Sequence, residues 1–128
     1  MHLLFYGLNL NPPWVEGLRN SVKELAKRLM LKGYQISFLT KGVIGEPEEE
    51  VIERIKYIKI PTASSSSYND GSLKFLLKSL KNFRRIIKDY RVDLVHGHGS
   101  YPLLGFTEFH SGVPRLFTLY SQIGRSST

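Results

Sequence analysis

Short apolar runs that alternate with amphipathic segments restrict the fold of this sequence more than any other feature. Residues 3–7 form an apolar run without polar alternation, which is typical of a strand buried on both faces. Residues 15–32 repeat apolar side chains at helical spacing, and residues 35–40 form a second apolar run. A strand, a helix and a strand in this order favour a right-handed parallel crossover.

The alternation continues along the rest of the chain. Further strands are predicted at residues 55–60, 93–98 and 115–120, a long helix at 72–90 and a short helix at 102–110. Residues 46–50 are acidic and predict a solvated loop, and residues 61–71 predict a flexible polar loop. We therefore expect an α/β domain with a Rossmann-like, doubly wound and mainly parallel sheet.

The length of 128 residues suits one domain, residues 1–128. Parallel sheets are normally covered on both faces, yet no helix is predicted after the fifth strand, so we expect an incomplete domain. The chain has no cysteine, which excludes disulfides and thiol catalysis and favours a reducing compartment. No apolar run approaches the roughly 20 residues that span a bilayer, and the N-terminus lacks the basic region of a signal peptide. We expect a cytoplasmic location.

The chain is basic, with 18 Lys and Arg against 11 Asp and Glu and a formal charge of +7. Such a charge favours anionic partners, although a solvated lysine-rich surface is an equally simple explanation. Nucleic acid is the least favoured partner, because the basic residues are spread over two helices and no known binding motif is present. Peripheral attachment to an anionic membrane stays open, since basic helices can lie at such surfaces.

Ligands of open α/β sheets bind beyond the carboxyl ends of the strands. This rule selects residues 7–17, Lys41 with Gly42, residues 96–101 and residues 120–124. The first such segment, "GLNLNPPWVEGLRN", leads into a helix N-terminus, where exposed amides favour an anion. Gly17 would let a phosphate approach the backbone, whereas Glu16 would oppose it. The segment is neither a dinucleotide-binding nor a P-loop motif. The alternative is a proline-stiffened loop in which Gly17 only packs tightly.

A second candidate is "HGHGS", where His96 falls inside a strand and His98 lies at its exit. Both side chains would share a face, but no third metal ligand is evident, so no metal site is predicted. We expect one of the two to be a core histidine and the other to line a cleft. No GxSxG is present, which gives hydrolase chemistry little support.

The segments "NPPWVEGLRNSVKELAKRLMLKGYQISFLT", "VDLVHGHGSYPLLG" and "SGVPRLFTLYS", in this order, resemble the N-terminal domain of GT-B glycosyltransferases of the retaining family 4 group. The resemblance covers nearly the whole chain and implies a truncated half of that fold, without the C-terminal donor-binding domain. It implies transfer of a sugar from a nucleotide-diphosphate sugar to a hydroxyl of a sugar or lipid-linked acceptor, with no cofactor. The isolated chain would then be inactive.

The resemblance also implies roles for individual residues. Gly17 and Glu16 stand at the two glycines of the family's donor-phosphate turn, and His98 and Tyr120 take catalytic positions, with Tyr120 where the family usually has a histidine. The residues expected in the acceptor cleft are Asn11, Ser100 and Ser121. A non-catalytic α/β binding module, or a subunit of a split enzyme completed by a C-terminal domain or a partner chain, remains the alternative.

Overall fold

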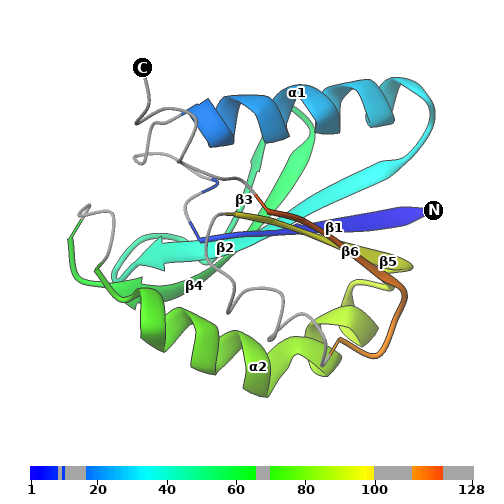
Figure 1. The fold of residues 1–128 in the computed structure, drawn as a ribbon. Coiled ribbons are helices and arrows are strands. Elements are labelled where there is room, and N and C mark those ends of the chain that lie inside the picture. Colours follow the sequence, from blue (N-terminus) through cyan, green and yellow to red (C-terminus); the bar gives the residue numbers. More distant parts are fainter. Residues whose placement is uncertain (9, 11–16, 66–69, 100–110, 120–128) are drawn as a thin grey trace.

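The computed structural model of the protein describes residues 1–8, 10, 17–65, 70–99 and 111–119. These residues form a six-stranded sheet with one helix on each face (Figure 1). The elements in chain order are β1 (His2–Tyr6), α1 (Gly17–Leu31), β2 (Gln35–Val43), β3 (Glu49–Ile52), β4 (Ile55–Ala63), α2 (Ser72–Asp89), β5 (Leu94–Gly99) and β6 (Arg115–Leu119).

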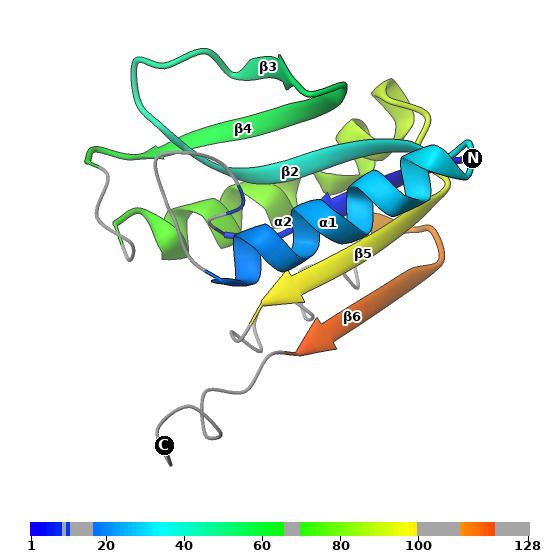
Figure 2. The ribbon, with the colours of Figure 1, turned by 90° about the horizontal axis from the view of Figure 1, so that it is seen from above.

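The strands lie in the order β3-β4-β2-β1-β5-β6 (Figure 2). β1 pairs in parallel with β2 and β5, β2 pairs in parallel with β4, and β5 pairs in parallel with β6. Five of the described strands therefore point the same way, and the sixth, β3, is antiparallel to its neighbour β4. The predicted Rossmann-like, mainly parallel α/β fold is confirmed.

β1 lies in the middle of the sheet and is buried along its whole length. Alternate side chains of a strand point to opposite faces. Leu3 and Phe5 accordingly belong to the core cluster under α1, and Leu4 and Tyr6 belong to the cluster under α2. This explains why an unbroken apolar run was needed at this position of the sequence.

The entry to α2 depends on one glycine. Gly71 precedes the helix with a φ of 71°, in the left-handed region that side chains disfavour. A Cβ at this position would lie 2.3 Å from the carbonyl oxygen of Thr62. The Thr62 hydroxyl also donates a 2.9 Å hydrogen bond to the Gly71 carbonyl, so the end of β4 and the start of α2 are tied together.

The structure corrects two of the predicted loops. Glu49–Ile52 is a strand rather than part of a solvated loop, and its glutamates form ion pairs with the neighbouring strand, Glu49 with Lys56 at 3.5 Å and Glu50 with Lys59 at 3.1 Å. The polar loop starts later than predicted, because β4 continues to Ala63. The predicted helix at 102–110 lies outside the described residues.

The remaining predicted elements agree with the structure to within a few residues, apart from β2. This strand runs on to Val43, three residues past its predicted end. Among the described residues, no helix combines the length and the apolar character that crossing a membrane requires.

Candidate functional site

The five parallel strands end at one edge of the sheet, and both helices begin there. Figure 1 shows this edge on the left, with the first turns of α1 and α2 above and below it. Gly17 is the first residue of α1, so its predicted position at a helix N-terminus is confirmed. Helix N-termini carry a partial positive charge and unpaired backbone amides, so this edge favours anionic groups.

The turn that follows β1 is held close to two neighbouring strands. The Gly7 amide donates to the Leu39 carbonyl at 3.1 Å. Thr40 then fixes the turn from both sides, because its hydroxyl donates to the Leu8 carbonyl at 2.9 Å and accepts from the Leu10 amide at 3.0 Å. Leu10 is buried in the cluster under α1. The start of the turn is therefore a fixed part of the edge.

Gly7 also brings the turn against the exit of β5. A Cβ at Gly7 would lie 2.9 Å from the His98 carbonyl oxygen and 2.9 Å from the Leu10 side chain. Only a glycine allows this approach. Sequence reasoning did not single out Gly7 or Thr40, although a glycine directly after a buried strand was a usable signal.

The two predicted histidines stack on each other beneath α1. Their ring centroids lie 3.9 Å apart, and Phe5 packs against both rings, at 4.7 Å from His98 and 5.5 Å from His96. The His96 Nε2 lies 2.8 Å from the Thr118 hydroxyl, within hydrogen-bonding distance. The expectation that the two histidines share a face is confirmed.

Burial governs the charge of this pair. His98 is only 1% exposed, and burial together with the neighbouring His96 lowers the pKa of His98 to about 3. Burial also lowers the pKa of the half-buried His96. Both rings are therefore neutral near pH 7. His98 is thus the core histidine of the pair, because it is almost fully buried whereas His96 is half-buried. The catalytic role of His98 stays a prediction. Among the described residues no group of three metal-binding side chains occurs.

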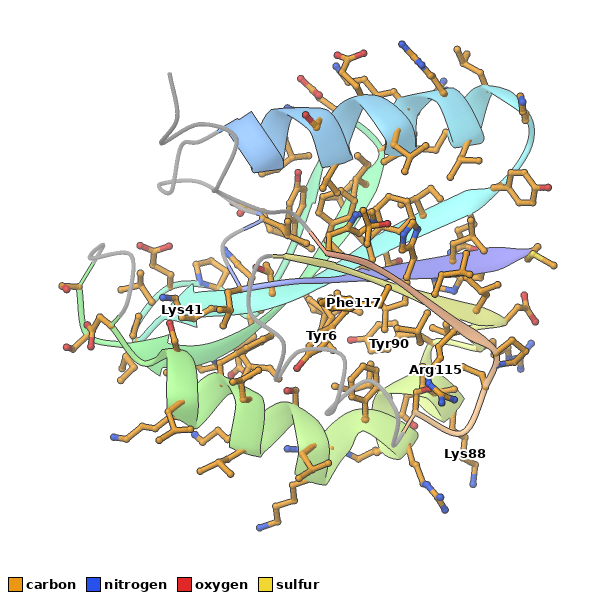
Figure 3. All side chains as sticks on the ribbon, in the orientation of Figure 1. Tyr6, Lys41, Lys88, Tyr90, Arg115 and Phe117 are labelled. Carbon is orange, nitrogen blue, oxygen red and sulfur yellow. The ribbon has the colours of Figure 1, made fainter. Side chains whose placement is uncertain are left out.

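Under α2, the same edge buries a lysine. The Lys41 side chain is 0% exposed, and its Nζ donates to the Ser72 hydroxyl at 3.3 Å, at the first residue of α2 (Figure 3). Burial lowers the pKa of Lys41 to about 8, against the opposing effect of the Asp70 carboxylate. The sequence predicted Lys41 directly after the second strand, at the carboxyl edge, whereas the structure places it within β2. Its burial was not predicted, because lysines are rarely buried.

Asp70 organises the segment between β4 and α2. Its Oδ2 accepts hydrogen bonds from the amide and hydroxyl of Ser64, at 2.8 and 2.9 Å, and from those of Ser65, at 2.8 and 3.1 Å. These bonds hold the pKa of Asp70 below its usual value, and the bond from the Ser64 hydroxyl has the largest effect. The ends of the predicted flexible loop are therefore tied by hydrogen bonds.

Of the predicted site residues, Gly17 and His98 are described, and both lie at the carboxyl edge. The predicted residues outside the described part of the chain are Asn11, Glu16, Ser100, Tyr120 and Ser121.

Two hollows on the described surface lie away from this edge. One of about 410 Å³ lies between α2 and β4 and is lined by charged groups that include Glu49, Lys78 and Arg85. The other, of about 330 Å³, is lined by apolar side chains that include Leu25, Leu116 and Met1. Because ligands of open α/β sheets bind at the carboxyl edge, we do not assign the site to either hollow.

Comparison with known proteins gives one family. The family model described as Glycosyltransferase Family 4 matches residues 15–127 of this chain. No curated protein is similar enough to the chain to count as a match.

Solved structures are similar in fold. Sucrose-phosphate synthase from Thermosynechococcus elongatus matches with a TM-score of 0.73 at 16% identity, over 99% of this chain and 35% of that chain. MurG from Acinetobacter baumannii matches with a TM-score of 0.57 at 20% identity, over 91% of this chain and 34% of that one. The C-terminal domain of a Pyrococcus furiosus hydrogenase matches with a TM-score of 0.56 at 17% identity, over 92% and 90%. At these identities the likeness concerns the fold alone, and the chain spans about a third of the two longer proteins.

Proposed function

The chain belongs to Glycosyltransferase Family 4, and on that premise we propose that it is the acceptor-side, N-terminal domain of an enzyme that moves a sugar from a nucleotide-diphosphate sugar to a hydroxyl. A second, donor-binding domain completes this enzyme and holds most of the nucleotide. The acceptor is a sugar or a lipid-linked sugar. No cofactor takes part, because the nucleotide sugar is itself a substrate.

The observation that supports this proposal is the position of Gly17 at the carboxyl edge. The start of the turn after β1 is fixed by Thr40 and lies against the exit of β5. Further along the chain, Gly17 is the first residue of α1. Backbone amides at that N-terminus would stabilise the negative charge that develops on the leaving diphosphate. They are held in place before the reaction, which is what makes such stabilisation effective.

In this proposal Gly17 and Glu16 face the donor phosphates, and Tyr120 and His98 act at the reacting sugar. Because burial keeps His98 neutral, His98 would serve as a hydrogen-bonding group rather than as a cation. The acceptor hydroxyls would be met by Asn11, Ser100 and Ser121.

The test is the Gly17→Trp variant of the protein that carries this chain together with a donor-binding domain. We expect kcat/KM for the donor sugar to fall by roughly a hundredfold, because the bulky ring keeps the diphosphate from the helix amides. The measurement is release of nucleoside diphosphate from a set of nucleotide sugars in the presence of hydroxyl acceptors.

Ser21→Trp is the matched control, since Ser21 is exposed one turn further along α1. It should leave kcat/KM unchanged. Equal activity of both variants would remove Gly17 from the site. Absence of any sugar transfer by the unmodified protein would favour the alternative, a non-catalytic binding module.

A further inference from the structure

Positive charge is concentrated on one helix of this protein. α2 carries six Lys or Arg residues and a single Asp, a net of five of the chain's seven formal positive charges, within 18 residues. The rest of the chain is therefore close to balanced. A uniformly solvated, lysine-rich surface would not collect its charge in this way.

The basic side chains of α2 lie on the side that faces away from the sheet. Lys74, Lys81 and Lys88 are spaced by seven residues, so they follow one line along the helix, opposite the buried stripe. All three are exposed, and Lys88 points away from the sheet in Figure 3. The other basic residues of α2, Lys78, Arg84 and Arg85, are also exposed and flank this line.

Two large leucines interrupt this basic surface. Leu73 is 61% exposed and Leu77 is 58% exposed, and their four-residue spacing puts them side by side on the first two turns of α2. We call these two leucines and the six basic residues the outer face of α2. Exposed apolar side chains surrounded by cations are characteristic of helices that lie in the plane of a membrane interface.

Among the described residues, most of the charges on this face have no ion-pair partner. On α1, by contrast, Lys23 and Lys27 both pair with Glu53, at 3.0 and 3.4 Å. Over the described residues, α2 forms a single ion pair, between Arg85 and Asp89 at 3.7 Å. The outer face of α2 thus retains nearly all its charge for an external anion.

We propose that the outer face of α2 docks the protein on an anionic lipid bilayer. The helix would lie flat, with Leu73 and Leu77 inserted at the level of the headgroups and the lysines and arginines among the lipid phosphates. Charge alone would suit nucleic acid equally well. The exposed leucines favour the bilayer, because a phosphate backbone offers no apolar layer to receive them.

The experiment measures binding of the full chain to vesicles of mixed phosphatidylglycerol and phosphatidylcholine, by sedimentation, with pure phosphatidylcholine vesicles alongside. We expect binding to the anionic vesicles only, weakening as salt is added. Each basic residue near an anionic surface strengthens binding about fivefold. Lys74→Glu with Lys81→Glu should therefore weaken vesicle binding by on the order of a hundredfold.

A matched charge control lies at the other helix. Arg28→Glu with Lys32→Glu changes the net charge by the same amount, at exposed positions at the end of α1 on the opposite face of the sheet. This variant should keep most of the vesicle binding. An equal loss in both variants would mean that net charge, and not the outer face of α2, drives binding, and would overturn the proposal.

The leucines distinguish a bilayer from nucleic acid. Leu73→Gln with Leu77→Gln should weaken vesicle binding by about tenfold and leave binding of a duplex DNA probe unchanged. Leu31→Gln, at a residue 89% exposed at the end of α1, should change neither. Circular dichroism and thermal melting verify that each variant is folded. Vesicle binding that does not depend on the two leucines, or DNA binding tighter than vesicle binding, would contradict the proposal.

Discussion

Both faces of the sheet bury aromatic side chains, but they differ in the side chains that they bury at the carboxyl edge. Under α1, the rings of Phe5 and Phe38 stack with their centroids 5.5 Å apart, and the neutral imidazole of His98 packs against Phe5. Under α2, the hydroxyl of Tyr6 lies 2.6 Å from that of Ser79, and the face ends in the ammonium of Lys41.

Each face therefore places one buried basic side chain beside the candidate site, and the two side chains titrate in different pH ranges. Burial lowers the pKa of His98 to about 3 and that of Lys41 to about 8. In both cases the folded state disfavours the protonated form. Stability should therefore increase with pH in two separate steps, one for each face.

The largest expected effect comes from removing a ring from either face. Phe5→Ala and Phe83→Ala should each lower the free energy of unfolding by about 3–5 kcal/mol, because both rings are fully buried. Only Phe5→Ala should also raise the pKa of His98, since Phe5 shields that imidazole. Urea unfolding and an NMR titration of the histidine ring protons measure both quantities. Equal His98 pKa values in the two variants would remove the proposed difference between the faces.

The acid step belongs to the α1 face. Below the ordinary histidine pKa of 6.5, the unfolded chain binds a proton that the folded chain refuses until its pKa of about 3. Stability should fall as the pH drops through this window, by about 2 kcal/mol between pH 6.5 and pH 5. Thermal melting across this range should show a shallower slope for His98→Gln. An unchanged slope would mean that other groups govern acid unfolding.

The alkaline step belongs to the α2 face and rests on the smaller of the two pKa shifts, from 10.5 to about 8 for Lys41 against 6.5 to about 3 for His98. Lys41 has a folded pKa of about 8 against 10.5 in the unfolded chain, so the unfolded chain holds more protons between these values. Stability should rise by about 2 kcal/mol as the pH increases from 8 toward 10. Lys41→Met should remove this rise, whereas Lys74→Met, at an exposed lysine, should keep it. Urea unfolding at several alkaline pH values provides the measurement, and a rise that persists in Lys41→Met would contradict the assignment.

Much of the fold could be predicted from the sequence because its hydrophobic periods are clear. The unbroken run of β1 and the helical stripe of α2 admit few other interpretations, and both elements appear where they were expected. Their order then fixes the parallel connections.

β3 could not be predicted because it is not stabilised by apolar periodicity. Its pairing rests on glutamates that meet lysines across the strand pair. The turn that follows it places Glu53 and Arg54 at φ values of 54° and 71°, where hairpin turns usually have Asn or Gly. Neither the strand nor its turn therefore gave the usual sequence signal.

The sequence predicted which edge of the sheet holds the candidate site, but not which side chains at that edge are buried. The rule for open α/β sheets selected the segments around Gly17, Lys41 and His98 correctly as parts of one edge. That Lys41 and His98 are buried depends on neighbours distant in sequence, Ser72 for one and Phe5 for the other. Spacing along one chain does not reveal such contacts.

The acidic strand β3 also has a consequence for how the protein behaves in concentrated solution. Sheet edges are templates on which neighbouring molecules can add strands and aggregate, and proteins suppress this with short, charged edge strands. β3 is four residues long, opens with two glutamates and is the outermost strand on its side. The short length of β3 and the charged side chains along it disfavour strand addition there, so the sheet is protected from edge-to-edge aggregation on the β3 side.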